Sequence, residues 1–352
     1  MNCGKFLDKL AELKDTVAIT YFGNPNPDII ASAFTLGKLL EAKNVEFDFI
    51  FESKIARPEN QLLINHLDIS IKNLHEADFE NYNHVSLVGC NPGNFTDSLN
   101  DEIQGELVNK LISVQDNQGD GGSVSESLKS KDVYVDIRPD YGACSTILAE
   151  CIENSEVDEF DEKIATGLYY GLHTVTEGLL KWFTPEDFRQ VINYVDKVDR
   201  VVLKENLSSN MTSETLEVIN RVTGEDYHET RGTYKFANAG PFFDKNQSDL
   251  SIVADLLMKE EGIEGIVIAG IDLDEELIIG SVRYTGSRYS AEKIAKTIAD
   301  GIGSGGGHVE MGVFQVQPGV LLDTLHKQST QDALMDSIKE RFFNMVGKNS
   351  NS

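Results

Sequence analysis

A run of glycines followed by a histidine is the feature of this sequence best suited to hold an anionic ligand. Gly305, Gly306, Gly307 and His308 come directly after a predicted helix, and Arg283 lies in a strand-like segment upstream. Glycine lets a ligand approach the backbone closely, and successive N–H groups can form a nest for a phosphate. The guanidinium of an arginine can donate two parallel hydrogen bonds to the oxygens of a phosphate. We therefore predict a phosphate- or nucleotide-binding glycine loop; a loop that only ends the helix is the alternative.

Two carboxylates in the first half follow strand-like runs. Asp28 comes after the run 17–22 and its Pro-rich turn, and Asp116 comes just after the run 111–114. The carboxyl ends of parallel strands are common ligand sites. An Asp at such a position also commonly caps the next helix. We predict capping or polar packing for Asp28 and Asp116, with a weak magnesium site as the alternative.

The elements that must position these residues alternate between strand and helix in the first half. Short apolar runs are separated by helical segments, at 17–22, 47–51, 85–88, 111–114 and 133–137. This alternation predicts an α/β fold with a doubly wound parallel sheet in the N-terminal domain.

The middle of the chain is helical, and the last third again mixes strands with helices. Helix-spaced apolar positions occupy 161–173, 185–202 and 213–223. Strands are predicted at 265–271, 277–284 and 313–316. The predicted organisation is a first domain over 1–200, a helical linker over 201–235, a smaller α/β domain over 236–346 and a disordered tail over 347–352.

Taken in order, these segments resemble the motifs of the DHH/DHHA1 phosphoesterase superfamily, with RecJ-like and oligoribonuclease-like members. The segments 24–32, 85–92, 113–118, 141–146 and 171–176 resemble the DHH motifs. The strand ending in Ser281-Val282-Arg283 and the run 305–308 resemble the DHHA1 domain, although Ser304 stands where the family often has a further glycine. The resemblance implies two divalent metals, usually manganese, in the first domain and a phosphate or nucleotide at Arg283 and Gly305 to His308.

Most positions that the resemblance assigns to metal ligands hold residues that cannot take that role. These are Phe22 for a His, Asn26 for an Asp, Gly89 for the bridging Asp, Asn117 and Gln118 for the paired His, and Val175 for the last Asp. Only Asp28 and Asp116 keep their type. A metal pair needs several anionic or imidazole donors. We therefore predict no catalytic residue and no resident cofactor.

Other residues that could do chemistry have structural interpretations. His173 could be recruited as a ligand, but its apolar helical surroundings favour a partly buried, satisfied histidine. Cys90 is expected to be a small buried residue rather than a nucleophile. The aromatic side chains could stack on bases, but they are expected in the core: Tyr21, Phe22, Tyr169, Tyr170, Trp182 and Phe183.

The bulk composition limits the partners. The 352 residues carry a net charge of −27, which repels duplex DNA and indicates a highly soluble protein or a salty cytoplasm. No signal peptide or membrane span is readable. The four cysteines are scattered without a CxxC pair, which favours a reducing cytoplasm and disfavours a zinc site or a disulfide framework.

Three functions follow from these observations. The leading hypothesis is a catalytically inactive phosphoesterase-like protein that binds a nucleotide or a short single-stranded nucleic-acid end through Arg283 and Gly305 to His308. The second is a metal-dependent phosphodiesterase or phosphatase acting on oligonucleotides or nucleotides. It would use manganese or magnesium in a rebuilt site with Asp28, Asp116 and either His173 or Asp136. The third is a structural or interaction protein without a ligand. A protein partner or a homodimer stays open.

Overall fold

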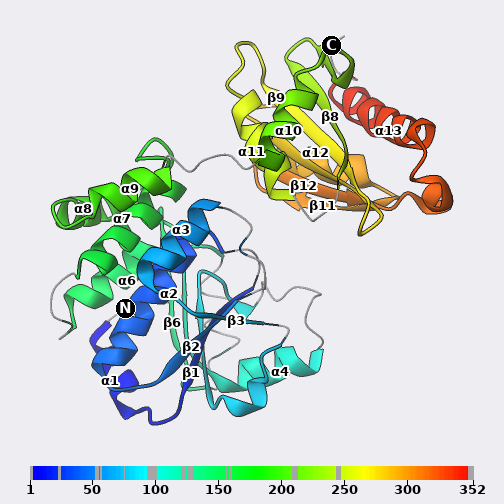
Figure 1. Cartoon of the computed structure of the whole chain (residues 1–352). Coiled ribbons are helices and arrows are strands. Elements are labelled where there is room, and N and C mark those ends of the chain that lie inside the picture. Colours follow the sequence, from blue (N-terminus) through cyan, green and yellow to red (C-terminus); the bar gives the residue numbers. More distant parts are fainter. Residues whose placement is uncertain are drawn as a thin grey trace. The chain divides into compact units, whose positions relative to one another are not determined.

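A computed structural model describes residues 3–22, 25–51, 55, 58–74, 76–92, 101–119, 124, 128, 131–155, 157, 161–207, 213–242 and 247–347. The chain divides into two compact units, Met1–Ser209 and Asn210–Ser352 (Figure 1). The linker predicted over 201–235 therefore contributes to both units. The predicted tail, apart from Gly347, lies outside the described residues.

The first unit is built on a six-stranded parallel sheet with the order β3-β2-β1-β4-β5-β6. Its strands are β1 (Val17–Tyr21), β2 (Phe47–Phe51), β3 (Ile71–Asn73), β4 (His84–Val88), β5 (Leu111–Asp116) and β6 (Tyr134–Ile137). The predicted parallel sheet is confirmed. The strand order reverses between β1 and β4, and in such sheets ligands bind beyond the carboxyl ends of these two strands.

Helices cover both faces of this sheet because alternate side chains of each strand point to opposite sides. Val17 and Ile19 of β1 belong to one apolar core, and Ala18 belongs to the other. The helices among the described residues of this unit are α1 (Cys3–Glu12), α2 (Pro27–Ala42), α3 (Pro58–Leu67), α4 (Asp101–Lys110), α6 (Cys144–Glu153), α7 (Glu162–Val175), α8 (Pro185–Tyr194) and α9 (Arg200–Leu207), with a short 3-10 turn η1 (Phe79–Asn81). The helix predicted over 185–202 is thus two helices.

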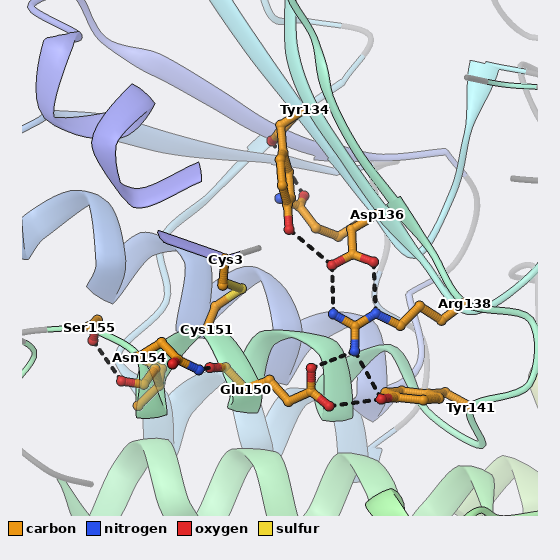
Figure 2. Close-up of a disulfide and its surroundings, with 12 residues drawn as sticks. Cys3, Tyr134, Asp136, Arg138, Tyr141, Glu150, Cys151, Asn154 and Ser155 are labelled. Carbon is orange, nitrogen blue, oxygen red and sulfur yellow. Dashed lines mark hydrogen bonds and ion pairs between the residues drawn. A yellow bond between two sulfur atoms is a disulfide. The ribbon is translucent and has the colours of Figure 1, made fainter. Parts of the chain in front are cut away.

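A disulfide joins α1 to α6, contrary to the prediction of reduced, unpaired cysteines. Cys3 and Cys151 are bonded, and both side chains are buried (Figure 2). Cys90 and Cys144 are the free cysteines, and they are also buried. The two partners are 148 residues apart in the chain. Sequence spacing therefore carried no sign of a contact that the packing of α1 against α6 creates.

The second unit holds a smaller mixed sheet with the order β11-β12-β10-β9-β8-β7. Its strands are β7 (His228–Arg231), β8 (Tyr234–Phe242), β9 (Gly265–Asp272), β10 (Leu277–Tyr284), β11 (Gly303–Gly307) and β12 (Met311–Val316). Only the neighbouring strands β8 and β9 are parallel in this sheet of described residues. The prediction of a smaller C-terminal α/β domain is confirmed.

Each face of the second sheet has its own apolar core. Helices α10 (Ser213–Val222) and α11 (Gln247–Leu257) cover one face, and α12 (Ala291–Ala299) and α13 (Gln328–Gly347) cover the other. Two 3-10 turns, η3 (Glu225–Tyr227) and η4 (Gly319–Thr324), complete the unit. Among the described residues of the whole chain, no helix has the length and apolarity needed to cross a bilayer.

Candidate functional site

The crevice between the carboxyl ends of β1 and β4 is filled by an aliphatic side chain. A Cβ atom placed on Gly89 would overlap Cδ1 of Ile29 and lie 3.1 Å from its Cγ1. Gly89 has a φ of +66°, a conformation that strains any residue with a side chain. Ile29 is 5% exposed. An apolar group therefore occupies the place where the resemblance expects a metal-bridging carboxylate to begin.

Asp28 caps a helix, but a different one from the helix that was predicted. Asn26 is the N-cap of α2, and its side chain accepts a hydrogen bond from the Ile29 N–H at 3.0 Å. The Asp28 carboxylate instead accepts from the N–H groups of Cys144 (2.9 Å) and Ser145 (2.8 Å), at the start of α6. These amides are donors that a helix N-terminus leaves unpaired. Both carboxylate oxygens are thus already used within the fold.

Asp116 at the end of β5 is also engaged in local hydrogen bonds. It accepts from the Asn91 side chain at 3.1 Å and from the Gln118 N–H at 3.0 Å. Burial raises the pKa of Asp116 to about 6, and the nearby charge of Asp28 contributes to the rise. Burial likewise raises the pKa of Asp28. Each oxygen of Asp116 thus has a hydrogen-bond donor within the fold, in keeping with the predicted polar packing.

The other positions to which the resemblance assigns metal ligands lie in varied surroundings. Phe22 is 5% exposed in the core between the sheet and α4, and the Asn117 side chain donates to the Tyr141 carbonyl at 3.3 Å. Gln118 is exposed, and Val175 is half-buried at the end of α7. His173 is half-buried near Tyr169, with ring centroids 6.0 Å apart, and burial lowers its pKa.

Asp136, the other candidate for a rebuilt metal site, belongs to an ion-pair network beside the disulfide (Figure 2). Its carboxylate accepts two hydrogen bonds from Arg138, at 2.7 and 2.8 Å, and a third from the Tyr134 hydroxyl at 2.9 Å. Arg138 also pairs with Glu150 on α6 and with the Tyr141 hydroxyl. Asp136 is 2% exposed, and this network pairs its buried charge with Arg138.

Cysteine chemistry is also disfavoured at this end of the sheet. Cys90 follows β4 and is buried, and burial raises its pKa to about 12. The thiolate is the nucleophilic form of cysteine. At neutral pH Cys90 is therefore an apolar packing residue, as its surroundings suggested.

The residues around the crevice do not fit a pair of divalent cations. Within the described part of the chain, no group of three His, Cys, Asp or Glu side chains is arranged to hold a metal ion. The remaining carboxylates, Asp28 and Asp116, are committed to amide donors. An apolar wall and two occupied carboxylates cannot replace the hydration shell of two such ions.

In the second unit, the glycine run is an edge strand and not the loop that was predicted. Gly303 to Gly307 form β11, which pairs with β12 only, at the edge of the sheet built by the described residues. A Cβ on Gly305 would lie 2.5 Å from the Ala295 carbonyl oxygen of α12, so the glycine allows close packing of that helix. An extended strand cannot curl its N–H groups into a nest.

The edge still presents backbone donors. The hydrogen bonds from His308 N–H to the Met311 carbonyl and from Gln317 N–H to the Ile302 carbonyl set the register of the hairpin. In an antiparallel ladder, bonded and non-bonded pairs alternate. The N–H groups of Gly303, Gly305 and Gly307 therefore point away from β12, toward the open edge of the sheet.

The predicted binding residues share one face of this sheet. Arg283 of β10 lies opposite Met311 of β12, which in turn faces His308 just after the end of β11, so the three residues form one row. Gly306 lies in the next row beside Val313, and a Cβ on Gly306 would meet nothing within 4 Å. Met311 and Val313 are 42% and 39% exposed. The face beside α11 is thus open above β11 and β12, with an apolar floor.

Arg283 is less available than the sequence suggested. Its side chain is 8% exposed and pairs with Asp255 of α11, with Nε 2.5 Å from Oδ1. Its Nη1 donates to the Ser281 hydroxyl at 3.0 Å. The Asp255 side chain is 50% exposed, so an anion that reaches Arg283 has to compete with this carboxylate.

The residues that shape the crevice at Gly89 and the open face of β11 and β12 were not predicted from the sequence. Asp255, Met311 and Val313 are ordinary in type and belong to no motif, and Ile29 lies within the segment 24–32 but at a position to which the resemblance assigns no role. The sequence did carry a signal for Met311 and Val313. In β12 these two side chains point to one face of the sheet, and Phe314 and Val316 point to the other, so both faces of the strand are apolar. Nothing in the sequence pointed to Ile29 filling the space at Gly89.

Comparisons with known proteins agree with this architecture. Residues 232–334 match the DHHA1 domain family. The chain is 25% identical over 346 residues to an uncharacterised protein of Methanocaldococcus jannaschii, covering 98% of this chain and 67% of that protein.

Solved structures share the fold over nearly the whole chain. An exopolyphosphatase-related protein of Bacteroides fragilis matches with a TM-score of 0.67 and 13% identity, covering 96% of this chain and 97% of that one. RecJ of Thermus thermophilus, solved with Mn²⁺, matches with a TM-score of 0.55 and 13% identity, covering 98% of this chain and 54% of RecJ. The family match identifies a DHHA1 domain over residues 232–334, and over nearly its whole length the chain shares the fold of these two solved structures.

Proposed function

We propose that this protein is a catalytically inactive member of the DHH/DHHA1 phosphoesterase superfamily that binds a nucleotide or a short single-stranded nucleic-acid end on the open face of β11 and β12. The observation that carries the first half of the proposal is the side chain of Ile29 in the crevice at Gly89. Two-metal hydrolysis needs ligands that bridge both ions. Here an aliphatic group stands in that place, so the proposed protein holds a ligand without hydrolysing it.

The second half of the proposal rests on the open face of the second sheet. His308 and the outward N–H groups of Gly305 and Gly307 supply donors for phosphate oxygens. Met311 and Val313 supply an apolar floor on which a base or sugar can lie. Gly306 leaves that face without a side chain, so a ligand can reach the backbone. Because the chain carries a net charge of −27, binding depends on these local contacts and not on long-range attraction.

Hydrolysis assays test inactivity. The relative RecJ was solved with Mn²⁺, so manganese is the first metal to add, followed by magnesium. The substrates are short oligoribonucleotides, 3′,5′-bisphosphate nucleotides, polyphosphate, pyrophosphate and cyclic dinucleotides. We expect no turnover above a metal-only control. Metal-dependent turnover that disappears in Asp28→Asn or Asp116→Asn would instead establish the rebuilt metal site.

Titration calorimetry with mononucleotides and a labelled short single-stranded RNA tests binding. We expect Gly306→Val to weaken binding by about tenfold or more, because its side chain stands where the ligand lies. Its melting temperature should stay close to wild type, since the space above Gly306 is open. Gly105→Val, on α4 of the first unit, is the matched control because a Cβ there also meets nothing within 4 Å. Equal affinities for wild type and Gly306→Val would exclude this face as the binding site.

A further inference from the structure

Helix α8 has its polar side facing the protein and its apolar side facing solvent. Asp187, Gln190 and Tyr194 are buried, with 0%, 1% and 1% of their surfaces exposed. Phe188 and Ile192, one turn apart on the opposite side, are 47% and 56% exposed. A surface helix normally buries its apolar stripe. The reversed orientation of α8 therefore leaves an apolar stripe without a partner in the described structure.

The buried side of α8 is fixed by hydrogen bonds, so the helix cannot turn its apolar side inward without losing them. The Asp187 carboxylate accepts from the Gly142 N–H at 2.9 Å and the Thr184 N–H at 2.7 Å, and also from the Thr146 hydroxyl. Thr184 and Asp187 form a capping box at the start of the helix. Rotating α8 would move Asp187 away and leave the Gly142 N–H and the buried Thr146 hydroxyl without their acceptor, which is costly.

The segment before α8 extends the same apolar surface. Phe183 precedes the N-cap and Phe188 is the fourth helical residue, the two positions that contact each other in a hydrophobic staple. Leu180 and Trp182 are 88% and 71% exposed. The indole N–H of Trp182 donates to the Asp140 carbonyl at 2.9 Å, which ties the exposed ring to the first unit. Two of these aromatic residues, Trp182 and Phe183, had been predicted to lie in the core, and that prediction is wrong.

A strained turn holds this segment outward. Three consecutive residues, Glu177, Gly178 and Leu179, have left-handed φ angles of 49°, 67° and 67°. Such angles are unfavourable for non-glycine residues and persist only when surrounding contacts impose them. Thr176 supplies these contacts: its hydroxyl accepts from Leu179 N–H at 3.2 Å, and its carbonyl accepts from the next two N–H groups. The backbone strain of this turn therefore lies directly beside the exposed side chains of Leu180 and Trp182.

The charges around the surface indicate what kind of partner fits. Among the described residues, the carboxylates Asp140, Glu153, Glu177 and Glu186 lie on the segments beside this surface, and two cations are recorded in ion pairs with them. Lys181 is paired with Glu177, and Arg189 is paired with both Glu153 and Glu186. The surplus of negative charge repels a phosphate backbone, and a second copy of a chain with a net charge of −27 is repelled in the same way. A basic protein segment meets no such barrier.

We propose that Leu180, Trp182, Phe183, Phe188 and Ile192, together the α8 surface, dock a protein segment whose apolar side chains are flanked by lysine or arginine. Apolar anchors supply the affinity, and the acidic rim selects the basic flank. This surface and its test are independent of the nucleotide site proposed on the second unit.

The chain offers a direct probe, because Trp182 is its sole tryptophan. The full-length protein is titrated with a synthetic peptide of leucine and lysine whose leucines recur at helical spacing. We expect the emission of Trp182 to start at the wavelength of a solvated indole, then to shift to the blue and resist acrylamide quenching as the peptide binds. The matching peptide with glutamate in place of lysine should produce no shift.

Variants distinguish docking on this surface from general attraction to an acidic protein. Phe188→Ser and Ile192→Ser should each weaken peptide binding by about tenfold or more, the loss expected for a central apolar anchor. Both side chains already face solvent, so the melting temperatures should stay close to wild type. Val201→Ser is the matched control, because Val201 is 67% exposed on α9 and lies outside the α8 surface. It should bind the peptide as wild type does.

Several outcomes would overturn the proposal. One is a Trp182 that is already blue-shifted and protected in the free protein. Others are an equal shift with the glutamate peptide, a shift that grows with protein concentration alone, or quenching by a single-stranded oligonucleotide. Peptide binding that survives in both Phe188→Ser and Ile192→Ser would have the same consequence.

Discussion

The side chain of Ile29 occupies the space into which a side chain on Gly89 would have to grow. The two residues come from α2 and from the end of β4, on either side of the point where the strand order reverses. In parallel sheets of this kind, ligands bind beyond the strand ends at that point. In this structure an acidic side chain on Gly89 would overlap Ile29, so the single substitution Gly89→Asp does not by itself create a metal ligand there.

An aspartate at position 89 should lower the free energy of unfolding and should not create a metal site. Gly89→Asp forces a side chain against Ile29 and places a non-glycine residue at a φ of +66°. Overpacking and left-handed strain each cost about 1–3 kcal/mol of unfolding free energy. We expect a clear loss in urea-denaturation midpoint and no stoichiometric Mn²⁺ by metal analysis. Gly105→Asp, at an open position, should leave the midpoint nearly unchanged; a stable Gly89→Asp that binds Mn²⁺ would contradict this account.

The raised pKa of Asp116 predicts a pH-dependent difference in stability between wild type and Asp116→Asn. The pKa of Asp116 rises from 3.8 to about 6 on folding, so the folded state binds the proton more tightly than the unfolded state. Protonation of Asp116 therefore adds to the free energy of unfolding. This contribution is fully present below pH 3.8 and is lost as the pH rises through about 6. The rise corresponds to at most about 3 kcal/mol.

Asparagine does not titrate, so Asp116→Asn should gain stability relative to wild type between pH 4 and pH 7. Urea denaturation of both proteins across this window measures the difference. Asp323→Asn is the control, because an exposed carboxylate keeps its hydration on folding. Parallel curves for wild type and Asp116→Asn would show that burial does not perturb Asp116.

The disulfide should be detectable by thiol counting and by its effect on unfolding. The chain has four cysteines, so denatured but unreduced protein should show two free thiols and reduced protein should show four. The bond closes a loop across a separation of 148 residues, which in the chain-entropy description contributes up to about 5 kcal/mol. Cys3→Ser and Cys151→Ser should therefore lower the melting temperature of the oxidised protein. Four free thiols before reduction would rule the bond out.

The ion pair between Arg283 and Asp255 predicts that removing the acid improves anion binding. Asp255→Asn keeps the size of the side chain but ends its charge competition for the guanidinium, which has its Nε 2.5 Å from Oδ1. We expect tighter nucleotide binding by calorimetry, by several-fold, with an increased dependence on salt. Glu260→Gln is the control, because this acid of the same unit pairs with Lys235 instead. Unchanged affinity in Asp255→Asn would mean that Arg283 supports the fold and does not contact the ligand.

The fold class could be read from the sequence because it depends on local periodicity. Strand runs such as 85–88 and helices such as α7 carry their pattern within a few residues, and alternation of the two predicts a parallel sheet. The glycine run 303–307 was predicted to be a loop, and that prediction is wrong because the run forms the strand β11. The pairing that makes it a strand comes from Met311 to Val316, and sequence order does not show that register.

The sequence by itself determined the two-domain architecture. It also showed that Gly89, Asn117, Gln118 and Val175 carry neither the carboxylates nor the imidazoles that the resemblance expects there, because residue type alone settles whether a side chain is one of these donors. Only the tertiary structure decided what replaced them. Ile29 at Gly89, Asp28 on the amides of α6, the bond between Cys3 and Cys151, and the outward face of α8 all join segments distant in sequence. Which groups meet across such distances is set by packing of whole elements, and no local pattern encodes it.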